Sequence, residues 1–570
     1  MQKNLADLHS VFVPFETVKF EGGTVIYMNE CIDCELNRSQ LLEKYSYIIP
    51  NNEGDNPPDK EKKTFLAERY GGDGMLTNGG GARCGFDGRY QLKGLGANRL
   101  VGKRPPDARG NSHANGFLSL DIAIYESIWA EIVNIALPYG AVRTVAIIDL
   151  GIDFEESNAP HARALLVRMP AVRPAHFIRA TFFKEKKIAA LSPDAERVKA
   201  VIQTLNLYLP NEKVGQPYDN HDEQLSDGIV ELARRFAKQF AASKSSRIFH
   251  ANVSASNLTL DGAWMDLAGT KIFSDRCWWD GFDESTFFEE FTPAISSINE
   301  LCYYLYKYQV VSIGTANHIA ARALECFTSE YEKQLSLYNA VQAGFPLNIL
   351  ESLTHNPIFL DFSTQLKTIL SLDKFSMTPI CTKSGWRGYE HWISRVYIQL
   401  LKHKQRNIPQ DFSWISKDEQ LINKLTSTYD ILFELILADA KSKGVSPECF
   451  EKCIALNSTR LNRCSALLTE LYDEVVNTRE KSCKTQDISL YETLFKNAKN
   501  DATQSFNIDC GYYLRIWKNL NATIYYDATL NLYTAEFEDN NPSITGTLRE
   551  LTQHKNVPND FISFYDGILE

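Results

Sequence analysis

Hydrophobic and polar positions follow two different periods along the chain. Apolar residues recur at three- and four-residue spacing, which predicts amphipathic helices, over residues 117–136, 194–209, 222–243 and 287–308. Two nearly continuous apolar runs, residues 138–151 and 164–183, predict buried strands instead. Because elements of both kinds are present, we expect the α+β fold class.

Beyond these elements the pattern is almost entirely helical. Between about residue 318 and residue 478 it predicts a succession of amphipathic helices, broken by Pro346, Pro357, Pro379 and Pro409. From about residue 507 the pattern changes to the alternation of strands with a turn between them. We therefore predict a long helical region followed by a small terminal α+β module.

The N-terminal region carries signals for shorter elements. A short helix, an apolar run at residues 23–28 and a second helix at 39–47 precede a polar loop at 50–63. Asp87 and Gly88 favour a hairpin turn that leads into a strand at residues 90–93.

Composition and charge narrow the class of protein. The 570 residues are 44% hydrophobic and 23% charged, which is typical of a globular protein of two to four domains. A formal net charge of -11 argues against a nucleic-acid-binding or anionic-membrane surface. No apolar run approaches the roughly 20 residues of a membrane-spanning helix, and the N-terminus lacks a secretion signal, so we expect a cytoplasmic protein.

The cysteines agree with a reducing compartment. Twelve of them are spread along the chain without paired spacing. Cys31 and Cys34 form a C-x-x-C, but a zinc site would need a second ligand pair and none lies nearby in the sequence. We interpret this motif as a coincidence or a buried thiol pair.

Residues 249–266 carry the strongest candidate chemistry. Asn257 lies in a small-residue loop, and Asp266 follows nine residues later, at the end of a predicted hairpin. An amide oxygen and a carboxylate placed in this way can converge on Mg²⁺, as in kinase-type phosphotransferases. Taken alone, an Asn and an Asp at this spacing are more often a turn cap and a solvated hairpin residue.

Other parts of a nucleotide site precede this stretch. Glycines that let backbone N–H groups approach phosphates are dense just before the predicted hairpin: Gly71, Gly72, Gly74, Gly79, Gly80 and Gly81. The predicted strand then ends at Lys93, and kinases hold phosphates with a strand lysine that a helix glutamate orients. Glu126 and Glu131, both on the predicted helix at 117–136, are the candidates for that glutamate.

Four arginines follow in or beside the apolar run at residues 164–183. An arginine among apolar neighbours needs an anionic partner, and a nucleotide phosphate or an internal carboxylate would serve equally well. The four are Arg163, Arg168, Arg173 and Arg179.

In this order, the motifs resemble those of the selenoprotein O (YdiU) family of kinase-like protein adenylyltransferases, over about residues 65–310. The glycine run with Arg83 is similar to the family's nucleotide loop, and the segment QLKGLG is similar to its lysine strand. By this resemblance Lys93 pairs with Glu126, Glu131 matches a second family glutamate, and Arg168 and Arg179 contact the phosphates, with Arg173 as the alternative to Arg168. His250, Asn257 and Asp266 match the family's histidine and its two metal ligands.

The resemblance implies a two-lobed protein-kinase-like fold with a long helical C-terminal extension. The implied parts are an N-terminal lobe at 1–165, a C-terminal lobe at 166–315, the extension at 316–500 and the terminal module at 501–570. It also implies ATP and Mg²⁺ or Mn²⁺ as cofactors, and transfer of AMP to a hydroxyl side chain of a protein or peptide.

Two positions depart from the family pattern. Ser256 stands where the family has an aspartate proposed as the catalytic base, and Ala268 replaces a glycine. Nucleotidyl transfer depends mostly on positioning and charge, so the loss of a base need not abolish it. Two alternatives stay open: a kinase or another ATP-dependent peptide-modifying enzyme, and a nucleotide-binding pseudoenzyme with a regulatory or scaffolding role.

Overall fold

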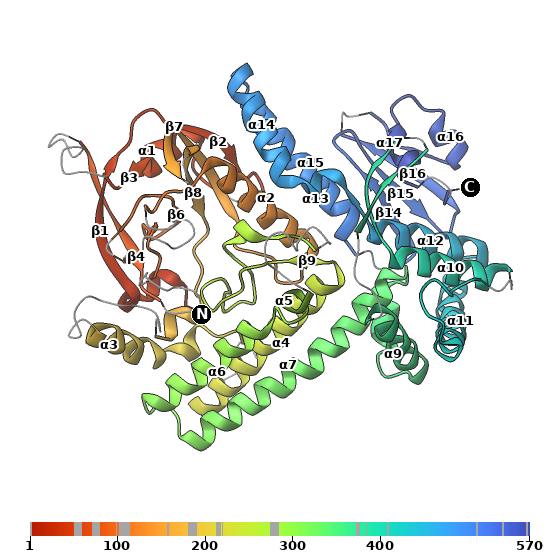
Figure 1. Cartoon of the computed structure of the whole chain (residues 1–570), viewed down its shortest axis with the longest axis horizontal. Helices are drawn as coiled ribbons and strands as arrows, with labels where there is room; N and C mark the ends of the chain where they lie inside the picture. Colours follow the sequence, from red (N-terminus) through yellow and green to blue (C-terminus); the bar gives the residue numbers. More distant parts are fainter. Residues whose placement is uncertain are drawn as a thin grey trace.

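The computed structural model is mixed α and β, and a large antiparallel sheet forms its N-terminal part (Figure 1). The structure describes residues 3–32, 34–50, 60–70, 80–98, 100–101, 115–156, 159–179, 191–211, 218, 220–273, 284–371, 377–383, 385–406, 410–508, 511–538, 541–565 and 568–569. The predicted combination of helices and strands is therefore confirmed.

Eight strands within the described residues make up this sheet, in the order β2-β7-β8-β6-β5-β4-β1-β3. They are β1 (Phe12–Lys19), β2 (Thr24–Met28), β3 (Tyr47–Ile48), β4 (Lys62–Glu68), β5 (Cys84–Phe86), β6 (Gln91–Lys93), β7 (Thr144–Glu156) and β8 (Ala159–Arg168). The hairpin predicted at Asp87 and Gly88 is confirmed, because it joins β5 to β6.

The two faces of the sheet are covered by different helices. In β8, Leu166 belongs to the apolar core beneath helix α2 (Leu120–Ala136), whereas its neighbours Leu165 and Val167 belong to the core on the opposite face, beneath α1 (Arg38–Tyr45). This is the two-residue alternation of a strand whose faces are both buried. It explains why the sequence of β8 is a nearly continuous apolar run.

Two predicted elements differ from the structure. The run at residues 164–183 is strand only up to Arg168, and a 3-10 helix follows at Pro174–Phe177. Pro170 and Pro174 lack the N–H that a sheet needs, so the strand ends before them. Near the N-terminus, β1 follows two 3-10 turns where the sequence predicted a short helix.

Long helices pack below the sheet in the view of Figure 1. They include α4 (His221–Ser245), α6 (Thr292–Lys307) and α7 (Ile313–Gln342), and α4 packs along α7. Shorter elements complete this part of the chain: α3 (Leu191–Ile202), β9 (Ile248–Phe249), β10 (Lys271–Ile272) and α5 (Glu284–Phe288). The helices predicted over these residues are thus confirmed, with the one at 287–308 divided into α5 and α6.

The helical region after α7 contains elements that the sequence pattern did not reveal. Its helices are α8 (Leu347–Ser352), α9 (Pro357–Ser371), α10 (Ile393–Arg406), α11 (Glu419–Ser442), α12 (Pro447–Asn462), α13 (Ala466–Thr469), α14 (Leu471–Thr485) and α15 (Ser489–Phe506). A small sheet of β11 (Met377–Cys381), β12 (Arg387–His391) and β13 (Arg463–Ser465) lies among them. Pro379 lies in β11, an edge strand, which is where a sheet tolerates proline.

The strands predicted from about residue 507 are confirmed. A four-stranded antiparallel sheet is followed by two short helices, in the chain order β14 (Tyr513–Lys518), β15 (Ala522–Asp527), β16 (Leu532–Phe537), β17 (Ile544–Gly546), α16 (Leu548–Thr552) and α17 (Asn559–Phe564). Its buried side chains share one apolar cluster with helices α9 to α12.

Helices α14 and α15 return from this region to the N-terminal sheet, beside α2 and β2 (Figure 1). The rings of Tyr27 in β2 and Phe495 in α15 stack with their centroids 3.6 Å apart. Arg479 of α14 donates a hydrogen bond of 2.6 Å to Asp121 in the first turn of α2. Helix α2 is therefore packed against the sheet on one side and against the C-terminal helices on another.

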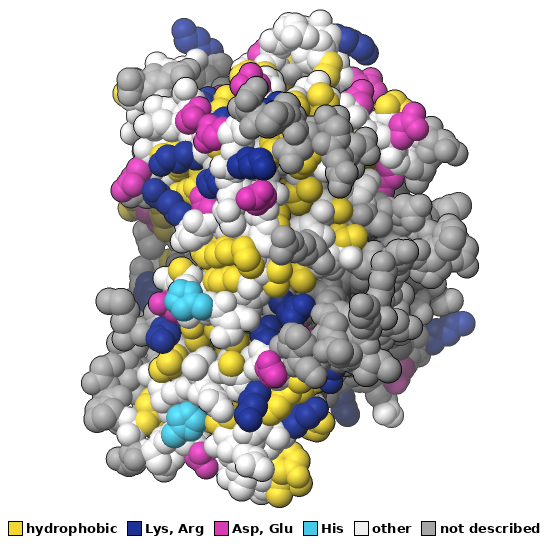
Figure 2. Space-filling view, turned by 90° about the vertical axis from the view of Figure 1, so that its left-hand side faces the viewer, with side chains coloured by type: hydrophobic (Ala, Val, Ile, Leu, Met, Phe, Trp, Pro, Cys, Tyr) yellow, Lys and Arg dark blue, Asp and Glu magenta, His cyan; other side chains and the backbone are white. Residues whose placement is uncertain are grey.

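The surface of the described residues carries both signs of charge. Figure 2 shows the side of the molecule at the left of Figure 1, where Lys and Arg side chains are interspersed with Asp and Glu. Within the part of the chain that the structure describes, no helix is long and apolar enough to cross a membrane.

Candidate functional site

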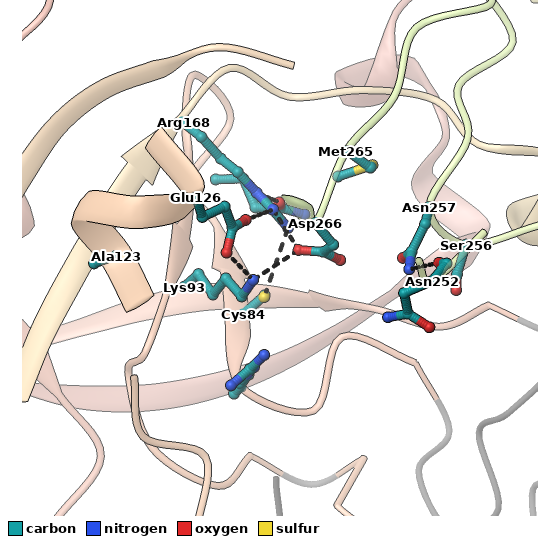
Figure 3. A network of polar contacts seen from close by, with 12 residues as sticks. Cys84, Lys93, Ala123, Glu126, Arg168, Asn252, Ser256, Asn257, Met265 and Asp266 are labelled. Carbon is teal, nitrogen blue, oxygen red and sulfur yellow. Dashed lines mark hydrogen bonds and ion pairs between the residues drawn. The ribbon is translucent and has the colours of Figure 1, made fainter. Parts of the chain in front are cut away.

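Four charged side chains from distant parts of the sequence meet beside the sheet (Figure 3). Lys93 Nζ lies 2.6 Å from Glu126 Oε2 and 2.9 Å from Asp266 Oδ1. Arg168 Nη1 lies 2.6 Å from Asp266 Oδ1 and 3.3 Å from Glu126 Oε1. We call these four residues the charged cluster. Its two cations balance its two carboxylates.

The elements that carry the charged cluster explain why it forms. In the antiparallel pairing of β6 with β8, Gln91 is opposite Arg168 and Lys93 is opposite Leu166. Lys93 is two residues from Gln91, so Lys93 and Arg168 lie on one face of the sheet. Helix α2 covers that face and presents Glu126 to both cations.

The backbone turns sharply just after Lys93. Gly94 has a φ of +99°, and a Cβ there would lie 2.5 Å from the carbonyl oxygen of Ala164. Glycine is therefore required at this position. The turn ends β6 at the residue that carries the ammonium group.

Asp266 is held in an uncommon backbone conformation. Its φ of 57° and ψ of 59° are left-handed, and it precedes the 3-10 helix Leu267–Gly269. Such conformations in non-glycine residues cost free energy and concentrate at functional sites. The Met265 N–H donates to the Asn257 carbonyl at 3.0 Å, and the Thr259 N–H donates to the Ala263 carbonyl at 3.0 Å. The predicted hairpin before Asp266 is therefore present.

The surroundings keep Asp266 ionised. Burial alone would raise the pKa of its carboxyl, but Arg168 and then Lys93 hold that pKa well below its usual range. The Asp266 side chain is still 22% exposed, whereas that of Lys93 is 2% exposed. Asp266 is thus the member of the charged cluster that a ligand from solvent reaches most easily.

Asn257 lies on the segment next to Asp266, and its side chain is separate from the charged cluster (Figure 3). Its Nδ2 donates a hydrogen bond of 2.7 Å to the Asn252 carbonyl, which fixes the amide plane and assigns Oδ1 as the remaining acceptor. Amide and carboxylate oxygens suit Mg²⁺ and Mn²⁺. In the described ranges, no group of three or more His, Cys, Asp or Glu side chains could hold a metal ion. A metal here would bind Asp266 and Asn257 and complete its shell with ligand or water oxygens.

His250 positions the loop between these two candidate ligands. Burial lowers the pKa of His250 to about 4, so the ring is neutral at pH 7. Its Nε2 lies 3.1 Å from the Met265 carbonyl, and its Nδ1 accepts from the Asn252 N–H at 3.3 Å. The neutral ring therefore carries its proton on Nε2 and ties both ends of the loop together.

Ser256 is buried, with 5% of its surface exposed. Its Oγ lies 2.8 Å from Ser254 Oγ. Its carbonyl accepts a hydrogen bond of 3.0 Å from Arg173 Nη1. The hydroxyl group at this position is thus engaged within the loop.

The other arginine candidates lie outside the charged cluster. Arg173 is buried, with Nη2 3.4 Å from Glu68 Oε2 and its guanidinium over the ring of Tyr70. Arg179 lies 3.8 Å from Asp194, and Arg163 donates to the Leu95 carbonyl. Of the four predicted arginines, the structure brings only Arg168 to Lys93 and Asp266.

The remaining candidate residues make contacts within the fold and lie outside the charged cluster. Glu131 accepts two hydrogen bonds from Arg143, so the partner of Lys93 is Glu126. Arg83 donates to the Phe117 carbonyl at 3.3 Å. Gly80 and Gly81 lie beside the end of β4, where Gly80 forms a β-bridge with Arg69 and the Gly81 N–H donates to the Glu68 carbonyl. Gly71, Gly72, Gly74 and Gly79 lie outside the described residues.

A second buried polar network lies behind the charged cluster, and sequence reasoning did not identify it. Glu68 accepts hydrogen bonds from Gln91 and lies 3.0 Å from His176 Nε2, and Gln91 in turn accepts from Arg168. Burial would raise the pKa of Glu68, but Arg173 and His176 lower it below its usual value. The available sequence signal was Glu68 itself, a charged residue that directly follows the apolar residues 65–67 at the end of β4.

No family model matches the chain, and no curated protein matches it.

Proposed function

We propose that this protein has a two-lobed kinase-like core that binds ATP with Mg²⁺ or Mn²⁺ and transfers AMP to a hydroxyl side chain of a protein or peptide. The observation that carries the proposal is the buried Lys93–Glu126 ion pair at 2.6 Å, placed 2.9 Å from Asp266. A strand lysine, a helix glutamate and a metal-binding aspartate are the parts that kinase-type sites use to hold a triphosphate.

Each member of the charged cluster has a role in this proposal. Lys93 and Arg168 contact phosphate oxygens, and Glu126 keeps Lys93 oriented toward them. Asp266 and Asn257 hold the metal, which would neutralise the phosphates. Arg173 stays with Glu68 and supports the loop through the Ser256 carbonyl, so Arg168 is the phosphate contact.

In the proposed reaction, a substrate hydroxyl oxygen forms a bond to the α-phosphorus of ATP. The bond from that phosphorus to the bridging oxygen of the β-phosphate breaks, and pyrophosphate leaves. The hydroxyl proton passes to solvent or to the leaving group, because Ser256 is no base at neutral pH. The same residues would serve phosphoryl transfer if the γ-phosphorus faced the hydroxyl.

One observation favours a second candidate, a nucleotide-binding regulatory protein without turnover. Ser256 is buried and bonded to Ser254, so it offers no carboxylate to an attacking hydroxyl. General-base catalysis is worth about 10²- to 10⁴-fold. A site without it holds ATP better than it activates an acceptor.

The experiment uses ATP labelled at the α- or the γ-phosphate, with Mg²⁺ or Mn²⁺ and a mixture of acceptor proteins. Label from the α position alone supports AMP transfer, and label from the γ position alone supports phosphorylation. ATP binding by calorimetry without transfer of either label supports the regulatory protein.

Two variants test the site itself. Asp266→Ala should abolish metal-dependent ATP binding. Asp261→Ala, an exposed carboxylate in the same hairpin, should leave it unchanged. Undiminished binding in both Asp266→Ala and Lys93→Met would place the nucleotide elsewhere and overturn the proposal.

A further inference from the structure

A cavity away from the charged cluster combines an aromatic lining with a partly buried ammonium group. It has a volume of about 330 Å³ and is lined by residues of α4, α6, α7 and α9, helices in the lower part of Figure 1. A second cavity of about 200 Å³ adjoins it and shares Lys244 and Phe288 with it. We call the pair the Lys244 cavity. Its size is in the range of small-molecule sites.

The walls of the Lys244 cavity are mostly aromatic and aliphatic. Phe327 and Tyr331 of α7 stack on each other, with Phe291 against both, and Leu366 of α9 faces them. Such walls bind the apolar body of a ligand by burial, and aromatic rings add further contact energy with a ring of the ligand.

Two buried hydroxyl groups line this apolar space. Tyr331 is 9% exposed and Ser363 is 8% exposed. Among the described residues, neither the Oη of Tyr331 nor the Oγ of Ser363 has a hydrogen-bond partner. Burying a hydroxyl without a partner costs about 1–3 kcal/mol. Two such groups in one cavity indicate that an acceptor belongs there.

Lys244 supplies the charge. Its Nζ lies 4.2 Å from the centre of the Phe288 ring and donates to the Phe288 carbonyl at 3.4 Å. Burial and then the neighbouring Lys367 lower the pKa of Lys244 to about 8. Lys367 also lines the cavity and pairs with Glu332 at 3.4 Å. With two lysines and one glutamate, the cavity has a net positive charge.

We propose that the Lys244 cavity is a binding site for a small hydrophobic carboxylate, with its ring or hydrocarbon body between Phe291, Tyr331 and Leu366 and its carboxylate on Lys244. An ammonium and two hydroxyl groups donate hydrogen bonds, and a carboxylate accepts them with two oxygens. An alcohol would satisfy the hydroxyl groups but not the ammonium, and an amine would meet repulsion.

Three probes of one shape test this assignment: 4-phenylbutyrate, 4-phenylbutan-1-ol and 4-phenylbutylamine. Calorimetry on the full chain at pH 7 and without nucleotide should give at least about tenfold tighter binding of the carboxylate than of the others, the value of a charged hydrogen bond. Equal affinity for the three probes, or no binding of any, overturns the proposal.

Variants locate the binding site. Lys244→Met keeps the length of the side chain and should remove the preference for the carboxylate. Lys333→Met, on the exposed side of α7, should retain the preference in full. A preference that survives Lys244→Met places the site elsewhere and overturns the proposal.

A measurement on the unaltered protein guards against misfolding of the variant. Phenylbutyrate should slow acetylation of Lys244 by an amine-reactive reagent, followed by mass spectrometry, and should leave that of Lys333 unchanged. Equal rates at Lys244 with and without the carboxylate contradict the proposal. Because neither assay contains ATP, failure here is distinguishable from failure of the proposed AMP transfer.

Discussion

Lys93 holds the charged cluster together, so its replacement by methionine should be costly to the fold as well as to ligand binding. Lys93→Met preserves most of the side-chain volume and removes the ammonium group. Glu126 and Asp266 then share Arg168 as the one cation of the cluster, and the cluster gains a net negative charge in a buried setting.

The contact distances set the magnitude. At an effective dielectric constant of about 20, unit charges separated by the 2.6 and 2.9 Å of the two Lys93 contacts attract by about 6 kcal/mol each. Most of this attraction offsets the cost of removing the charges from water. Removing one partner of a buried ion pair lowers the free energy of unfolding by about 3–5 kcal/mol. We expect that loss in the free energy of unfolding for Lys93→Met.

A second substitution separates charge balance from ligand binding. In Lys93→Met with Glu126→Gln, the remaining Arg168 and Asp266 charges balance again. The double variant should recover at least about half of the lost stability, since the uncompensated charge is the larger part of the cost. Under the proposed function it should recover no affinity for ATP, because the ammonium proposed to contact phosphate is still missing.

The assay is urea unfolding followed by circular dichroism, with ATP affinity measured by calorimetry. Lys62→Met is the control, because Lys62 pairs with Glu16 at the surface of the same sheet, at 3.7 Å. An exposed pair contributes about 0–1 kcal/mol. The reasoning fails if Lys93→Met costs no more than Lys62→Met, or if the double variant is less stable than the single one.

Three further outcomes follow from individual residues. Gly94 and Gly88 both have a positive φ, but only at Gly94 would an added Cβ also clash with a neighbouring atom, the Ala164 carbonyl oxygen. Gly94→Ala should therefore lower the unfolding free energy by about 3 kcal/mol or more, and Gly88→Ala by about 1–2 kcal/mol. Equal losses in the two variants would contradict this. Ser256→Asp should raise the initial rate of label transfer from ATP by about tenfold or more, and an unchanged rate with ATP still bound would show that a base is not limiting. Burial raises the pKa of the Glu290 carboxyl well above its usual range, so the folded state binds a proton more readily than the unfolded state. Glu290 therefore destabilises the fold increasingly as the pH rises above the usual pKa of a glutamate. In urea unfolding, Glu290→Gln should stabilise the protein more at pH 8 than at pH 5, and an equal effect at the two pH values would refute this.

The fold could be predicted from the sequence wherever one period dominated. Helix α2 is apolar at helical spacing, so its type and its end at Ala136 were predicted from the sequence. It begins after Ser119, whose side chain caps it, which is three residues later than the predicted start at residue 117. β11 to β13 were not predicted, because strands of three to five residues between long helices leave no period to detect. The end of β8 was missed because an apolar run continues past Pro170.

The residues of the charged cluster could be predicted from the sequence, but which of the candidate residues contact one another could not. The order of Lys93, Glu126 and Asp266 along the chain suggested their partnership, and the structure joins them. Nothing in the sequence separated Arg168 from Arg179, because both lie among apolar residues. The register of β6 with β8 decides between them, since it puts Arg168 opposite Gln91 and two residues from the level of Lys93. Register depends on side-chain packing across the sheet, which a single sequence does not display.

The charged cluster also bears on how a metal and a nucleotide would bind together. Asp266 Oδ1 already accepts hydrogen bonds from Lys93 and Arg168, so a bare divalent ion would compete with two cations for one carboxylate. A triphosphate offers those cations new anionic partners, while the metal takes the carboxylate that they release. Each ligand would thus reduce the cost of binding the other, and reciprocity would require the coupling to be equal in both directions. Under the proposed function, the charge balance of the charged cluster would therefore favour a metal–nucleotide complex over either ligand alone.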